Sequence, residues 1–301
     1  MTIDTARLFH LNVNCSDLDR ARRFYVDGIG LTVGVRTTVD EVQPGTAFAL
    51  DRARWDAWIL LGTAGYEGGA IDLLEWKEPL PTGAPPAQLT ETGFQRFGII
   101  VPDLDATVLR LRALDGDVWG EPHITELANG TTVRLVMTCD PDGSVIELRE
   151  GDGPRVSFVA VCCADLERTV ACYRALGLRE ATRFTIAHDD GARLRLNGPV
   201  TMHEVVFTAP GGGEVLVIAA GFEAPPARRS PPRPLNALGL GRMAFLVTDL
   251  DAATAALRVE ADVELVSEPV TMAMGPGLPD LRFVCARGPD GEVIEYIEQP
   301  N

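Results

Sequence analysis

A fourfold internal repeat constrains the fold of this 301-residue chain more than any other feature. Four stretches carry an Asp-Leu pair whose Asp lies seven positions after the first residue: HLNVNCSDLDRARRFY from His10, RFGIIVPDLDATVLRL from Arg96, FVAVCCADLERTVACY from Phe158 and RMAFLVTDLDAATAAL from Arg242. Apolar residues alternate before each Asp, as in a strand, and follow helical spacing after it. This recurrence indicates four copies of one structural unit.

The aspartates of the repeat predict where its helices begin. Asp17, Asp103, Asp165 and Asp249 each stand where a helix needs an N-cap acceptor for its free backbone N–H groups. Each copy continues through short strands. Copies two and four close with CDPDGSVIELRE and RGPDGEVIEYIE, in which Pro-Asp-Gly predicts a tight turn before a final strand. The module is therefore a strand, a helix and about three further strands.

Proline-rich connectors separate the four copies at residues 78–93, 150–155 and 222–239. A single module leaves one face of its sheet uncovered, so two modules must pair to bury it. We therefore predict an α+β fold of four βαβββ modules in two domains, residues 1–152 and 153–301.

The composition of the chain excludes some classes of binding partner. The formal net charge of −16, from 43 acidic and 27 basic residues, repels nucleic acid and anionic lipid surfaces. No run of about 18 apolar residues occurs, and the six cysteines lack metal-type spacing. We expect a cytoplasmic protein with reduced cysteines, a monomer or homodimer that binds a small molecule and neither nucleic acid nor membrane.

The module, with its HxxxxxxDL start and DPDGxxIEL finish, resembles the vicinal oxygen chelate superfamily, which includes glyoxalase I, extradiol dioxygenases and bleomycin-binding proteins. The resemblance implies two glyoxalase-like domains with cup-shaped mixed sheets. It also implies metal ligands from the first strand, usually His, and the last strand, usually Glu, of each module. A divalent metal bound there acts as a Lewis acid on neighbouring substrate oxygens.

Strand alternation then selects the side chains that face each cup. Around residue 10 it places His10, Asn12 and Asn14 on the cup side, opposite an apolar face that includes Phe9. Pairing copy one with copy two, and copy three with copy four, gives two quartets of ligand positions, which are His10, Asp72, Arg96 and Glu147 in the first domain and Phe158, Leu216, Arg242 and Glu295 in the second. The second quartet has a single carboxylate, so we expect that cup to be metal-free.

The first quartet leaves two interpretations open. His10, Asp72 and Glu147 are candidate ligands for Fe, Mn, Zn or Mg. Arg96 cannot ligate a metal, because a guanidinium keeps its proton, and it would instead form an ion pair with Glu147. In that metal-free alternative, Arg96 binds a substrate oxygen and His10 or Glu147 moves a proton. His10 could also be a satisfied polar residue without a chemical role.

The aromatic residues suggest what the first cup binds. All four tryptophans precede residue 150, and Trp55, Trp58 and Trp76 are candidate walls for a flat ligand, beside the polar Asn12 and Asn14.

We therefore expect an enzyme that acts on a small oxygenated metabolite, aromatic or polyketide-like, by isomerase, cyclase or lyase chemistry through an enolate in the N-terminal cup. A non-catalytic protein that sequesters an antibiotic or metabolite is the alternative. Extradiol ring cleavage fits less well, because Phe158 and Arg242 stand where those enzymes hold their metal.

Overall fold

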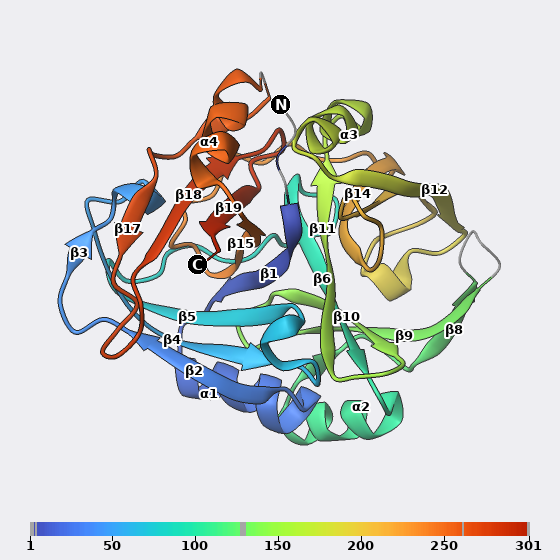
Figure 1. The fold of residues 1–301 in the computed structure, drawn as a ribbon. Helices are drawn as coiled ribbons and strands as arrows, with labels where there is room; N and C mark the ends of the chain where they lie inside the picture. The colour runs from blue at the N-terminus through green and yellow to red at the C-terminus, as the bar shows by residue number, and fades with distance from the viewer. Residues whose placement is uncertain (1–2, 4, 127–130, 261, 300–301) are drawn as a thin grey trace.

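The computed structural model describes residues 3, 5–126, 131–260 and 262–299. Two curled sheets and four α-helices dominate this part of the chain (Figure 1), so the predicted α+β class is confirmed. The helices are α1, α2, α3 and α4, at Leu18–Arg23, Leu104–Ala113, Leu166–Ala175 and Leu250–Val259. None of these described helices has the length and apolar content to cross a membrane.

The first sheet combines module one with module four. Its strand order is β16-β18-β19-β15-β1-β5-β4-β2, with β3 and β17 paired to β4 and β18. The strands are β1 (Thr5–Asn14), β2 (Thr32–Thr38), β3 (Gln43–Pro44), β4 (Arg52–Leu61), β5 (Ala70–Glu78), β15 (Gly239–Val247), β16 (Glu264–Leu265), β17 (Val270–Met272), β18 (Leu281–Arg287) and β19 (Val293–Glu298).

The second sheet combines module two with module three. Its strand order is β12-β13-β14-β11-β6-β10-β9-β7, with β8 paired to β9. The strands are β6 (Gly93–Val101), β7 (Asp117–Val118), β8 (His123–Glu126), β9 (Thr132–Cys139), β10 (Val145–Glu150), β11 (Arg155–Cys163), β12 (Arg179–His188), β13 (Val200–Thr208) and β14 (Val215–Ala224).

The predicted grouping of copies one and two in one cup, and of copies three and four in the other, is therefore wrong. Antiparallel pairing of β1 with β15 joins module one to module four, and pairing of β6 with β11 joins module two to module three. All four modules expose the same kind of edge along their first strand, so the repeat pattern does not specify which edges pair. The sequence boundary near residue 152 stays a prediction, but each sheet takes one module from either side of it.

Modules one and two do touch, though at the helix side rather than within a sheet. The Tyr25 hydroxyl donates to Asp140 Oδ2 at 2.9 Å, and the Tyr173 hydroxyl of module three donates likewise to Glu292 Oε1 of module four at 2.8 Å. Each bond joins the helical segment of one module to the Pro-Asp-Gly turn region of the next. Neighbours in sequence are thus held together across the two sheets.

The predicted helix starts are confirmed in all four modules. The side chains of Asp17, Asp103, Asp165 and Asp249 each accept a hydrogen bond from the backbone N–H three residues later. After α1 the chain continues as a π-helix over Phe24–Ile29 and ends at Gly30, whose φ of 101° suits glycine. These ends fix where each first strand gives way to its helix.

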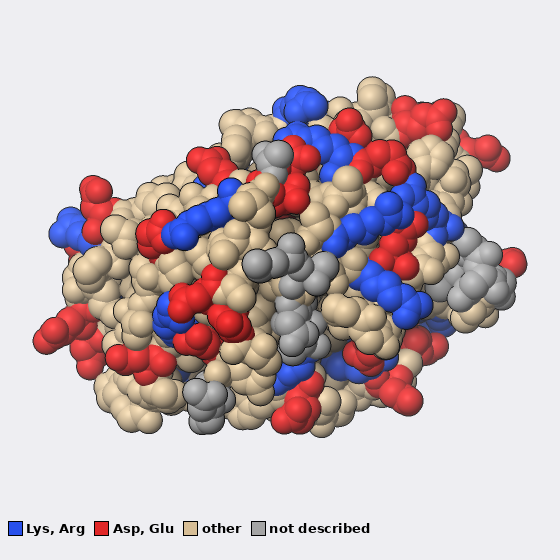
Figure 2. All heavy atoms as spheres, turned by 45° about the horizontal axis from the view of Figure 1, so that its top comes forward, with Lys and Arg blue, Asp and Glu red and all other residues tan. Residues whose placement is uncertain are grey.

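The main hydrophobic core lies on the helix side of the sheets, where Leu11 and Val13 of β1 pack in one cluster with Leu18 and Tyr25. A second cluster lies on the cup side of the first sheet. On the surface, acidic and basic side chains are interspersed over the face drawn in Figure 2.

Candidate functional site

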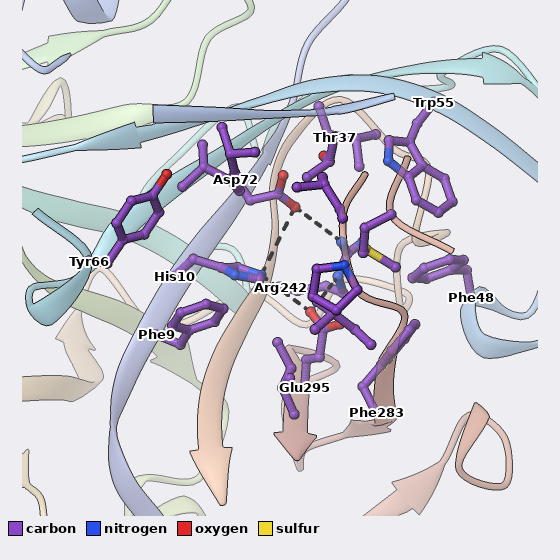
Figure 3. A pocket seen from close by; sticks show the side chains of 18 residues that line it. Phe9, His10, Thr37, Phe48, Trp55, Tyr66, Asp72, Arg242, Phe283 and Glu295 are labelled. Carbon is purple, nitrogen blue, oxygen red and sulfur yellow. Dashed lines mark hydrogen bonds and ion pairs between the residues drawn. The ribbon is translucent and has the colours of Figure 1, made fainter. Parts of the chain in front are cut away.

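The cup of the first sheet contains a cavity of about 180 Å³. Four charged or titratable side chains line it: His10 from β1, Asp72 from β5, Arg242 from β15 and Glu295 from β19. These are the four central strands of the sheet, so the polar groups form the floor of the cup. All four side chains are buried and point toward one another (Figure 3).

The floor is a closed set of contacts between these side chains. His10 Nε2 lies 3.4 Å from Glu295 Oε2 and 4.0 Å from Asp72 Oδ2. Arg242 reaches the same two oxygens, with Nε 3.1 Å from Glu295 Oε2 and Nη2 3.5 Å from Asp72 Oδ2. Each carboxylate thus lies between a histidine and an arginine.

Several buried polar atoms on this floor have no hydrogen-bond partner. They are both ring nitrogens of His10 and the Nη1 atom of Arg242. The contact between His10 and Glu295 is close enough for an ion pair but is not aligned as a hydrogen bond. Because buried polar groups in proteins are almost always bonded, this cluster of unpaired donors and acceptors indicates a site for a polar ligand group.

The charges on the floor are strongly coupled. Burial alone would raise the pKa of Glu295, but the attraction of Arg242 and the contact with His10 outweigh it and lower that pKa to about 2. Burial would lower the pKa of Arg242, yet Glu295 and Asp72 raise it above its ordinary value. Glu295 and Arg242 are therefore a charged pair throughout the physiological pH range.

A divalent metal, which the family resemblance implies, does not fit this donor set. The two carboxylate oxygens that face His10 are the ones that Arg242 contacts, and a permanent guanidinium charge between them opposes a cation. In the part of the chain that the structure describes, no group of three or more His, Cys, Asp or Glu side chains is arranged to hold a metal ion. The predicted ligand set of His10, Asp72 and Glu147 is not assembled, because Glu147 belongs to the other sheet.

The walls of the cavity are apolar and largely aromatic. Figure 3 shows Phe48, Trp55 and Phe283 on one side of the polar floor and Phe9 and Tyr66 on the other. Phe48 packs against Trp55 and Phe283, with ring centroids 6.2 and 5.7 Å apart. The Arg242 guanidinium carbon lies 5.0 Å from the centroid of the Phe48 ring, a cation–π distance. The remaining apolar lining includes Val35, Ile59, Leu74, Met274, Leu278, Pro279, Leu281 and Ile297.

The two asparagines predicted to bind the ligand, Asn12 and Asn14, instead hold other parts of the protein in place. Asn12 donates to Asp72 Oδ2 at 3.0 Å, and so holds a floor residue in place. Asn14 donates to the carbonyls of Leu235 and Ala237 and accepts from Trp76, so it anchors a connector. Neither asparagine lines the cavity.

Of the three predicted tryptophans, Trp55 alone lines the cavity. Trp76 is fully buried behind Phe48, with ring centroids 5.3 Å apart. Trp58 lies on the opposite face of β4 and packs under Arg36. Its odd spacing from Trp55 along one strand was the signal that the two rings face opposite ways.

Arg96 and Glu147 form a separate cluster in the second sheet. Arg96 Nε donates to Glu147 Oε2 at 2.7 Å and Nη2 donates to Glu204 Oε1 at 2.8 Å, while Nη1 bonds Gln95. Arg149 also contacts Glu147, and with Arg96 it lowers the pKa of that buried carboxyl to about 2. The predicted ion pair between Arg96 and Glu147 is confirmed, but the prediction that these residues share a cup with His10 is wrong.

Two finer predictions also need correction. Leu216 was predicted at the position that corresponds to Asp72, but it packs in the helix-side core. The corresponding residue is Ile218, which pairs with Ala160 as Asp72 pairs with Asn12. Phe9 lines the cavity next to His10 instead of packing under the helix, because the pairing of β1 with β15 shifts register between Leu8 and His10.

Sequence comparison identifies the unit that is repeated. The model of the Glyoxalase/Bleomycin resistance protein/Dioxygenase superfamily matches residues 7–148 and again residues 155–296. Lactoylglutathione lyase GLX1 of Arabidopsis thaliana is 27% identical over 179 residues, 58% of this chain and 56% of that protein. A putative lactoylglutathione lyase of Brassica oleracea is 28% identical over 179 residues, with the same coverage. The chain thus spans little more than half the length of these relatives.

Structural comparison agrees. Glyoxalase I from Zea mays superimposes with a TM-score of 0.67 at 18% identity, over 97% of this chain and 92% of that one. A putative dioxygenase from Bacillus subtilis gives 0.60 at 15% identity, over 100% and 87%. Identities this low carry the fold and no more. The family model, which matches nearly the whole sequence in two stretches, shows that the chain belongs to the Glyoxalase/Bleomycin resistance protein/Dioxygenase superfamily.

Proposed function

We propose that the chain is a lyase- or isomerase-type enzyme that moves a proton at a carbon next to a carbonyl group, in the cup of the first sheet. One observation carries the proposal: the buried floor of an apolar cavity holds a histidine and a guanidinium nitrogen that both lack hydrogen-bond partners. A base and an anion-binding donor side by side are what enolate chemistry requires.

In this proposal His10 takes the proton. A neutral imidazole ring has one nitrogen that can accept a proton, and both ring nitrogens of His10 lack a hydrogen-bond partner that would occupy them. When His10 becomes positively charged, the ionised Glu295 at 3.4 Å stabilises it, as the carboxylate of a catalytic triad stabilises its histidine.

Arg242 binds the oxygen on which negative charge develops. Its Nη1 atom is the donor left without a partner, whereas Nε and Nη2 contact Glu295 and Asp72. The two carboxylates therefore hold the guanidinium in place before the substrate arrives, so little reorganisation accompanies the reaction. The sequence suggested Arg96 for this role, but the guanidinium nitrogens of Arg96 are all bonded within the other sheet.

The relatives support the class of chemistry. The two relatives compared above are named lactoylglutathione lyases, and a lactoyl thioester has a carbonyl group next to a carbon that carries a hydrogen atom. We further propose that the reaction needs no divalent metal held by these four residues, because Arg242 stands among the donors. Six free cysteines support a reducing cytoplasm as the location.

The test is proton exchange in D₂O, followed by NMR. Phenylacetone, α-hydroxyacetophenone and S-lactoylglutathione are incubated with chelator-treated protein, and deuterium uptake next to each carbonyl is measured. We expect catalysed uptake for at least one compound, and a loss of about 100-fold or more in His10→Ala. His203→Ala is the matched control, because His203 is half-exposed on the other sheet and bonds Thr185 and Glu223. The proposal fails when the unmodified protein exchanges none of the three, or when His10→Ala exchanges as fast.

A metabolite-sequestering protein is the second candidate. The aromatic walls favour it, because they bind a flat ligand without any chemistry. Tight binding of such a ligand, with no exchange in the unmodified protein, would replace the enzyme proposal with this one.

A further inference from the structure

We propose that the cavity of the first sheet selects uncharged compounds the size of a single substituted ring, and that it rejects glutathione conjugates. This inference rests on the proposed function for the place of the carbonyl oxygen, at Arg242. It concerns what else the substrate carries, and so goes beyond the reaction class.

The charges that line the cavity are the first reason to expect an uncharged ligand. Arg242 is the one Lys or Arg among the described residues that line it, and Asp72 and Glu295 are the carboxylates. One guanidinium against two carboxylates leaves a net charge of −1 with His10 neutral. A ligand carboxylate would find the guanidinium charge of Arg242 already paired with Asp72 and Glu295, and would meet a floor of negative net charge. Because a buried charge without a partner is costly, an anionic ligand is disfavoured.

A glutathione conjugate is the informative case, since the relatives are named for one. Its peptide carries two carboxylates and one ammonium group. The remaining polar lining side chains, Thr37 and Tyr66, are neutral. The walls therefore contain no cations to receive the carboxylates of the peptide.

The size of the cavity is the second reason, because it suits a single substituted ring. Its volume is about 180 Å³, and an apolar protein cavity of about 150 Å³ encloses one benzene molecule. A single ring with a short carbonyl side chain therefore fills the space. A tripeptide conjugate exceeds this volume, so most of its peptide would have to lie outside the cavity.

The shape of the walls is the third reason. The Phe48 ring stands edge-on to Trp55 and Trp76, at interplanar angles of 82° and 80°, and lies tilted by 33° to Phe283. Interlocked rings in a buried cluster are held in fixed orientations, so they present a rigid surface to the ligand. Apolar contact with these walls, and one hydrogen bond from Arg242, describe a ring ketone held by its oxygen.

Calorimetric titration at neutral pH tests the selection. The probes are phenylacetone, its analogue with a para carboxylate on the ring, and S-lactoylglutathione. We expect phenylacetone to bind at least about tenfold more tightly than either anionic probe, because their charges lose water without gaining a partner. Equal or tighter binding of S-lactoylglutathione would overturn the inference.

A charge-insertion variant makes the test specific to the cavity walls. Leu278 lies in the loop between β17 and β18 and lines the cavity, so Leu278→Arg adds a cation there without altering a strand. We expect it to reduce the preference for phenylacetone over its carboxylated analogue by about tenfold. Leu80→Arg, at a residue that is 70% exposed and outside the cavity, is the control and should leave the preference unchanged. A preference that Leu278→Arg leaves unchanged would also overturn the inference.

These outcomes separate the inference from the proposed function. Selective binding of phenylacetone without any proton exchange would support the substrate class and refute the enzyme. Exchange that depends on His10 but prefers S-lactoylglutathione would support the enzyme and refute the substrate class.

Discussion

The Nε2 atom of His10 lies 3.4 Å from the Oε2 atom of Glu295, although these residues belong to the first and the last strand of the chain. The contact exists because β15 pairs antiparallel with β1 and parallel with β19. Asp72 and Arg242 reach the same point from β5 and β15. The candidate site is therefore built from both halves of the sequence, and neither half contains it alone.

The two halves should remain associated after the chain is cut between them. A protease site inserted between Gly151 and Asp152 lies in an exposed connector, and cleavage there leaves the pairing of β1 with β15 and of β6 with β11 intact. Size-exclusion chromatography of the cut protein should give one peak at the mass of the intact chain. Two separated halves, each still folded, would contradict the observed module pairing.

Removing the guanidinium from the floor should destabilise the fold strongly. Arg242→Met leaves Glu295 and Asp72 buried without their cation, and breaking a buried ion pair in this way costs about 3–5 kcal/mol. Urea unfolding measures the change in the free energy of unfolding. Arg258→Met removes an exposed partner of Glu268 and should cost less than about 1 kcal/mol. A small loss for both variants would show that Arg242 does not hold the floor together.

The second sheet should make the protein sensitive to acid. Glu147 has a pKa of about 2, below its ordinary 4.5. It therefore stabilises the fold above pH 4.5, and this stability is lost as the pH falls toward 2. The shift of about 2.5 pH units corresponds to roughly 3 kcal/mol. Urea unfolding should show unmodified protein more stable than Glu147→Gln at neutral pH, with a gap that narrows on acidification. A gap independent of pH would contradict the assigned ion pair, and Glu268→Gln serves as an exposed control.

Glu292, in contrast to Glu147, should make the folded protein less stable as the pH rises. Burial, and repulsion from Asp290, raise its pKa from 4.5 to about 7. The folded state therefore favours the protonated acid, so stability is full below pH 4.5 and is lost as the pH rises through 7. Relative to Glu292→Gln, which stays neutral, the unmodified protein should lose roughly 2 kcal/mol between about pH 5 and about pH 8. Thermal unfolding across this range measures the difference, and parallel curves for the two proteins would refute the raised pKa.

The repeat was enough to predict the module, because each of its signals is local. The capping bond of Asp17 or Asp249 involves residues three positions apart, so it can be read from sequence. The alternation that puts His10 on the cup face is local as well. The capping bonds and the cup-side position of His10 depend on a few neighbouring residues and were confirmed, whereas the register shift that brings Phe9 to the same side could not be predicted from the alternation.

The pairing of modules could not be predicted in the same way. Which first strand meets β1 depends on edges that look alike in all four copies, and on connectors whose path the sequence does not specify. For that reason the predicted site contained Arg96 and Glu147, whereas the site in the structure contains Arg242 and Glu295. Both pairs combine an arginine with a glutamate at equivalent positions, so residue types alone did not distinguish them.

The rate of proton exchange in four matched variants tests the central claim most directly. Two variants alter the first sheet, His10→Ala and Glu295→Gln, and two alter the second, Arg96→Met and Glu147→Gln, with circular dichroism confirming that each remains folded. The account predicts that both first-sheet variants lose exchange, His10→Ala by about 100-fold or more, while both folded second-sheet variants keep it. Loss of exchange in folded Arg96→Met or Glu147→Gln, with exchange retained in His10→Ala, would contradict the account.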